Sequence, residues 1–140
     1  MDSAAVQWVF RSICKRDALE WVMLDNRVLS YTRDGGATWR PIPWRMTVPG
    51  HLKRILHRAA WPPPLDCFGW YRGEVAVAWH YQGEEDFMIG KYMAIFSARK
   101  LRWEFRFVGT LAHADDTLFT WYESLGFETY NRLRQLVPAV

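Results

Sequence analysis

Residues 101–107, with the sequence LRWEFRF, carry the clearest two-residue period in the chain. Apolar residues alternate with charged ones, which is typical of a β-strand that turns one face to a core and the other to water. Two further strands are predicted before it, over residues 74–81 and 87–97, with a hairpin turn at residues 98–100. This half of the chain is therefore expected to form an antiparallel meander.

A second meander is predicted nearer the start of the chain. Strands are expected over residues 19–24, 27–33 and 37–42, because runs of β-branched and aromatic residues lie there between turn signals. Asp25-Asn26 is expected to form the first tight turn and Gly35-Gly36 the second. The two meanders resemble each other in layout only.

Two helices are predicted to flank the first meander. One begins at Asp2 or Ser3, with apolar positions at helical spacing up to Ile13, although the alternation in residues 7–13 is equally compatible with a strand. The other spans residues 51–60, where apolar and basic positions fall on opposite sides of a helix. Both helices are expected to cover a sheet.

A third helix is predicted from about residue 115 to residue 136. Its apolar side chains share a little over half of the helix circumference, and this register continues across Gly126, at a cost of about 1 kcal/mol for the glycine. The elements then follow the order α-βββ-α-βββ-α. We therefore expect an α+β fold with two antiparallel β-meanders of about six strands and three helices, in a single globular domain over residues 1–140.

The composition favours a chain that folds alone. Half of its 140 residues are hydrophobic and 16% are aromatic, unlike the polar composition of disordered chains. The longest apolar runs are far shorter than the roughly 20 residues of a membrane helix, and no signal-peptide core is evident. We expect a cytoplasmic protein in which Cys14 and Cys67 are reduced, buried thiols.

Residues 32–39, TRDGGATW, contain a compact turn motif. The segment is similar to the Asp box of sialidases and other β-propellers, S/T-x-D-x-G-x-T-W. The resemblance implies a structural hairpin in which Asp34 braces the turn, the glycines adopt positive φ and Trp39 packs beneath. Propellers repeat the box, whereas this chain has it once, so only the turn geometry is expected to carry over.

Residues 35–65 concentrate positive charge. They hold five Arg or Lys, two His, three Trp and six of the seven prolines, without one Asp or Glu. Removing that +5 from the whole-chain +3 leaves the remaining residues at −2. A solvated helix face beside a proline-rich loop would also account for this composition. As a partner-binding surface, the segment would present Arg40, Trp44, Arg45, Lys53, Arg54, His57, Arg58 and Trp61.

No assembled catalytic or metal motif accompanies this segment. His51 and His57 are six residues apart, so they point in different directions from a helix and do not form the pair that zinc sites use. Residues 84–86, Glu-Glu-Asp, are expected to form a solvated loop. We therefore expect a non-enzymatic protein without cofactor or metal.

The expected function is regulatory or inhibitory. The protein would bind a larger protein or protein–nucleic-acid assembly with an acidic surface, and a phage-encoded modulator of a nucleic-acid machine such as RNA polymerase is one concrete form of this hypothesis. Binding of single-stranded nucleic acid is one alternative, and an immunity or antitoxin-type protein that neutralises a toxin is another. If the interface lies elsewhere, the next candidate is the basic surface of Arg99, Lys100, Arg102 and Arg106.

Overall fold

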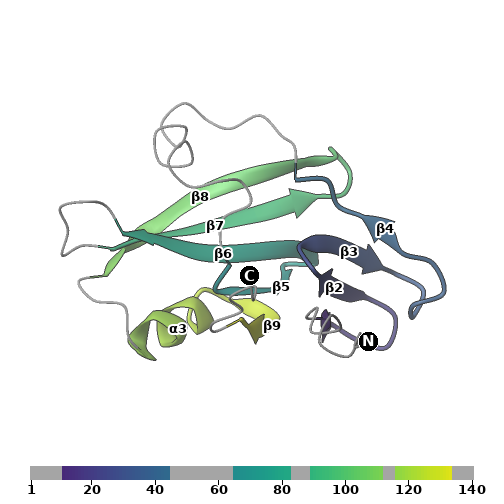
Figure 1. The fold of residues 1–140 in the computed structure, drawn as a ribbon, viewed down its shortest axis with the longest axis horizontal. Helices are drawn as coiled ribbons and strands as arrows, with labels where there is room; N and C mark the ends of the chain where they lie inside the picture. Colours follow the sequence, from purple (N-terminus) through teal and green to yellow (C-terminus); the bar gives the residue numbers. More distant parts are fainter. Residues whose placement is uncertain (1–10, 45–64, 83–88, 112–115, 134–140) are drawn as a thin grey trace, which may run out of the picture.

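The structure, a computed structural model, describes residues 11–44, 65–82, 89–111 and 116–133 (Figure 1). Within these ranges the chain forms two antiparallel sheets and one short helix. The first sheet has the order β1-β2-β3-β4, with β1 (Arg11–Lys15), β2 (Trp21–Asp25), β3 (Val28–Thr32) and β4 (Arg40–Pro41). The second has the order β8-β7-β6-β5-β9, with β5 (Cys67–Tyr71), β6 (Glu74–Gln82), β7 (Ile89–Ser97), β8 (Arg102–Leu111) and β9 (Phe127–Arg132).

The main core lies between the two sheets. Val22 and Leu29 of the first sheet are fully buried in the same cluster as Phe68, Trp70 and Val77 of the second. The alternation of β8 is kept, because Trp103 is buried in this core while its neighbours in the strand are more exposed. The sheets therefore pack face to face through the inward side chains of both meanders.

The two sheets are also joined where β1 lies beside β9 and β5. The side-chain amide of Asn131 donates to the carbonyl of Ile13 at 2.8 Å, and the indole N–H of Trp70 donates to the carbonyl of Cys14 at 3.2 Å. These bonds give two neighbouring carbonyls of β1 donors from side chains of the second sheet. Side chains of β5 and β9 thus hold β1 against the second sheet.

A short helix, α3 (Asp116–Glu123), packs on the other face of the second sheet (Figure 1). Its fully buried Tyr122 contacts a cluster with Cys67 and Ala78. A neighbouring cluster on this face contains Tyr71, Ala76, Met93 and Ile95. The second sheet is therefore covered on both sides around β5 and β6.

The predicted α+β fold is wrong, because the protein is mostly β. The expected first helix overlaps strand β1, which pairs with β2 from Arg11 to Lys15. The alternative strand interpretation of residues 7–13 therefore agrees with the structure at 11–13, and the residues before them lie outside the described ranges. Segment 51–60, the expected second helix, also lies outside them.

The predicted third helix ends much earlier than expected. Helix α3 stops at Glu123, and Gly126 adopts a φ of 95°, a left-handed value that favours glycine and ends a helix. The chain then forms β9, which pairs with β5 from Arg132 to Phe127. Pairing with an otherwise open strand edge outweighs the helical register that the sequence shows across the glycine.

The six predicted strands overlap β2, β3, β4, β6, β7 and β8, whereas β5 and β9 were not predicted. In the part of the chain that is described, no helix is long and apolar enough to cross a membrane.

Candidate functional site

Trp44 and Trp103 form a stack at the junction of the two sheets. Their ring centroids are 5.3 Å apart and their planes differ by 2°. Both indole N–H groups are bound, because Trp103 donates to the carbonyl of Pro43 at 2.9 Å and Trp44 donates to the carbonyl of Arg27 at 2.9 Å. The stack holds the chain that follows β4 against the start of β8, where Figure 1 shows the two running together.

The hairpin turn between β7 and β8 lies one residue pair beyond this stack. We call Arg99, Lys100, Leu101 and Arg102 the basic tip; all four are exposed. Leu101 is 73% exposed and adopts a φ of 54°. Its amide donates to the carbonyl of Ser97 at 2.7 Å, and the amide of Lys100 donates to the Ser97 hydroxyl at 3.1 Å. The turn therefore holds an apolar side chain outward among three cations.

The predicted binding residues are only partly described. Arg40 is exposed on the short strand β4, opposite Tyr31. Trp44 is half-buried in the stack with Trp103. The other predicted residues lie outside the described ranges, namely Arg45, Lys53, Arg54, His57, Arg58 and Trp61. The stack does bring the start of the basic segment to the base of the basic tip, two surfaces that the sequence presents as alternatives.

The turn that resembles an Asp box has the expected bracing. The carboxylate of Asp34 accepts hydrogen bonds from the Thr32 hydroxyl at 2.7 Å, the Thr38 hydroxyl at 2.6 Å and the Thr38 amide at 2.9 Å. These donors, the Thr38 hydroxyl first, lower the pKa of Asp34 to about 2. Gly35 and Gly36 have φ values of 70° and 94°, and Trp39 lies against Trp21. This is a structural role.

A depression of about 360 Å³ opens beside this turn. It is lined by Tyr31, Thr32, Arg33, Asp34, Thr38 and Arg40. The guanidinium of Arg33 lies over the rings of Tyr31 and Trp70, at 5.4 and 5.7 Å from their centroids. The guanidinium thus contacts one ring from each sheet.

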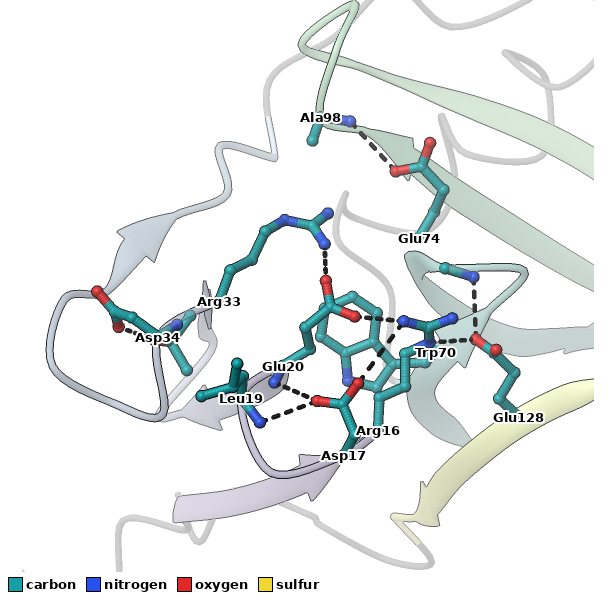
Figure 2. Close-up of polar contacts among 12 residues, drawn as sticks. Arg16, Asp17, Leu19, Glu20, Arg33, Asp34, Trp70, Glu74, Ala98 and Glu128 are labelled. Carbon is teal, nitrogen blue, oxygen red and sulfur yellow. Dashed lines mark hydrogen bonds and ion pairs between the residues drawn. The ribbon is translucent and has the colours of Figure 1, made fainter.

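Arg33 also belongs to a network of charged side chains that joins the two sheets (Figure 2). Glu20 of the first sheet pairs with both Arg16 and Arg33, and Arg16 also donates to Glu128 of β9 at 2.9 Å. Glu128 accepts in addition from the amide of Gly73 at 2.9 Å. The hydrogen bond from Arg16 is the main cause that lowers the pKa of Glu128. This network ties the two sheets together at an exposed end.

A second polar cluster lies on the outer face of the second sheet, beneath α3. His80 Nδ1 and Asp66 Oδ2 are 2.6 Å apart, and the Tyr122 hydroxyl donates to the Trp79 carbonyl at 2.6 Å and reaches Asp66 Oδ2 at 3.4 Å. The hydrogen bond to Asp66 raises the pKa of His80. The cluster links the start of β5, strand β6 and the helix.

Lys91 lies directly opposite His80 on strand β7. It is 1% exposed, and its Nζ is 3.6 Å from the centroid of the Trp121 ring. Gly109, its partner on β8, leaves the space into which Trp121 packs, because a Cβ there would lie 3.3 Å from that ring. Burial lowers the pKa of Lys91.

Asp66, His80, Lys91 and Tyr122 are not among the site residues predicted from the sequence. Asp66 and His80 are brought together by the pairing of β5 with β6, and β5 was not predicted. Both cysteines are buried free thiols, and burial raises the pKa of each. Among the described residues, no group of three His, Cys, Asp or Glu is placed to hold a metal ion.

Comparison with protein-family models, with curated proteins and with solved structures gave no match for this chain.

Proposed function

We propose that this protein is a small non-enzymatic docking protein that binds an acidic surface of a larger protein assembly through the basic tip. The exposure of Leu101 among three cations is the observation that carries the proposal. A leucine with a left-handed φ costs about 1–2 kcal/mol. Burying this side chain against a partner would return about 1.5–3 kcal/mol. The turn is thus preset to offer an apolar anchor.

The surrounding charges determine the chemistry of the partner. Arg99, Lys100 and Arg102 flank the leucine, and only Lys100 has a described acidic neighbour, Glu104 at 3.5 Å. That exposed pair is weak in water. An apolar anchor with a cationic rim fits an apolar pocket bordered by Asp and Glu, because complementary charges speed encounter and exclude wrong partners.

The basic segment continues this surface in sequence. Residues 45–64 follow Trp44 directly and contain Arg45, Lys53, Arg54 and Arg58 without an acidic residue. Because the stack on Trp103 fixes Trp44 at the base of the basic tip, we include Arg40 and this segment in the proposed docking surface. A modulator of a nucleic-acid machine such as RNA polymerase remains one form of the proposal, with the reduced Cys14 and Cys67 suited to the cytoplasm.

The described surface favours a protein partner over single-stranded nucleic acid. Stacking of bases needs exposed aromatic rings. The exposed large apolar residues in the described ranges are Ile13, Leu19, Val28 and Leu101, and none of them is aromatic. Trp44 uses its N–H and one ring face within the protein. An immunity protein against a toxin with an acidic surface is a special case of the same docking.

Site-specific crosslinking in the native host tests this proposal. A photoreactive residue replaces Leu101, and a matched control replaces Leu19, which is 57% exposed in a different turn. We expect one dominant crosslinked protein from position 101 and none from position 19. Changing Arg99 and Arg102 together to Glu should abolish the crosslink. Equal crosslinking from both positions, or a crosslink that survives the charge reversal, would contradict the proposal.

A further inference from the structure

We propose that the depression beside the Asp34 turn is a receptor for a carboxylate side chain, held by Arg33 and Arg40. The inference rests on the proposed function only for the nature of the partner, an acidic protein segment. It concerns a site next to the basic tip and not the tip itself, because Arg40 of the wider docking surface lines the depression and no residue of the basic tip does.

The two arginines lie on the same side of strands β3 and β4. Arg40 is directly opposite Tyr31, so their side chains share a face, and the Arg33 guanidinium lies over the ring of that same Tyr31. Both arginines border the depression of about 360 Å³. The volume is sufficient for a side-chain carboxylate, since a single water needs about 10–15 Å³ of such space.

Each arginine keeps donors for a ligand. Arg33 uses Nη1 for Glu20, but a guanidinium has five N–H donors, and the Arg33 side chain is 43% exposed. Arg40 has no acidic partner within 4 Å among the described residues. A carboxylate in the depression would therefore supply a counter-charge that no described residue gives Arg40.

The polar groups of the Asp34 turn are already used. The hydroxyls of Thr32 and Thr38 donate to Asp34, and the amides of Gly36 and Thr38 are bound within the turn. The remaining side-chain donors of the lining are the Tyr31 hydroxyl and the two guanidinium forks, whose planar geometry matches a carboxylate. A phosphate needs more hydrogen-bond donors than a carboxylate does. Its larger negative charge would also be repelled more strongly by the ionised Asp34. We therefore assign the depression to a carboxylate.

Nuclear magnetic resonance titration of the labelled full chain tests the inference. The probes are a hexaglutamate peptide and, separately, inorganic phosphate. We expect the peptide to shift the amide signals of Thr38 and Arg40 and the Nε signal of Arg33, with phosphate weaker. Arg40→Gln should weaken peptide binding by about tenfold, whereas Arg72→Gln, at an exposed arginine in the turn after β5, should leave it unchanged.

Arg33→Lys separates fork geometry from charge. It keeps the positive charge and loses the planar pair of donors, so the inference expects weaker binding than in the wild type. Binding equal to that of the wild type, shifts that persist in Arg40→Gln, or tighter binding of phosphate than of the peptide would each overturn the carboxylate receptor. The two proposals can fail independently. Crosslinking at position 101 does not require a carboxylate in the depression, and peptide binding at Arg40 does not require the basic tip.

Discussion

Gly69 and Thr129 approach each other more closely than any side chain would permit. A Cβ on Gly69 would lie 2.1 Å from the Thr129 carbonyl oxygen and 2.6 Å from the Cα of Tyr130. Gly69 is the central residue of β5, which pairs with β6 on one side and β9 on the other. The absence of a side chain at this position therefore permits β9 to close the edge of the second sheet.

We expect Gly69→Ala to destabilise the protein by about 3 kcal/mol, because the added carbon meets backbone that cannot move without breaking the β5–β9 pairing. Urea unfolding measures the change. Gly90→Ala is the matched control, since a Cβ there meets only the side chain of Tyr92, at 2.9 Å. Equal losses in the two variants would show that the approach of β9 is not the constraint.

The same strands show why the sequence predicted only part of the fold. All five residues of β5 are buried, so no alternation distinguishes this strand from a buried helix segment. In β9, Tyr130 packs with the cluster around Tyr122. Because residues 122 and 130 also share a face in a helical projection, the pattern resembled one continuous helix. The hairpins around β2–β3 and β6–β8 were predictable because their alternation and turns are local.

In the candidate site, too, contacts between residues close in sequence were predictable, whereas contacts between distant segments were not. The bracing of Asp34 was evident because its partners lie within four residues. The Asp66–His80 pair and the Trp44–Trp103 stack join residues that are far apart in sequence, and each depends on a strand pairing. The basic tip is visible in the sequence as charge, whereas the outward Leu101 depends on a backbone φ that composition does not indicate.

The pair formed by His80 and Asp66 predicts a pH dependence of stability. The folded pKa of His80 is raised above its unfolded value of about 6.5, so the pair stabilises the fold fully below that pH. This contribution is lost as the pH rises through the folded pKa. Lys91 lies opposite His80 on β7, and the Tyr122 hydroxyl lies 3.4 Å from the same Asp66 oxygen. The expected loss is up to about 1 kcal/mol.

Asp66→Asn tests whether the His80–Asp66 pair causes this pH dependence of stability. The variant keeps the shape of the side chain but removes its charge, so its stability should change less than that of the wild type between acid and mildly alkaline pH. Unfolding by urea across this range, with the His80 ring signals followed by magnetic resonance, gives both quantities. An unchanged pH profile in the variant would assign the dependence to other groups.

The stack of Trp44 on Trp103 predicts an energetic coupling of about 1 kcal/mol between the two residues. Trp44→Phe, Trp103→Phe and the double variant form the cycle, with stability measured by chemical unfolding. The pair Trp21 and Trp39 is the control, because its rings are 6.4 Å apart and tilted by 55°. A coupling near zero at residues 44 and 103 would mean that the stack does not stabilise the base of the basic tip.

Lys91 predicts the opposite pH behaviour to His80. Its folded pKa is lowered by burial, so the charged ammonium costs stability at neutral pH, and this cost disappears as the pH rises past the unfolded value of 10.5. Lys91→Met keeps most of the buried stem and removes the charge. We expect it to raise the free energy of unfolding by about 1 kcal/mol at neutral pH. The difference from the wild type should vanish in alkali.

Lys91→Ala is the control for packing, because it removes the stem as well as the charge and should destabilise the protein by about 2 kcal/mol. The contact with Trp121 opposes the first expectation, since a desolvated cation over an indole ring gains up to about 2 kcal/mol. Loss of stability in Lys91→Met would show that this attraction exceeds the cost of burying the ammonium. Repeating Lys91→Met in a Trp121→Leu background then separates the two contributions. Any loss of stability caused by Lys91→Met should occur only while the Trp121 ring is present.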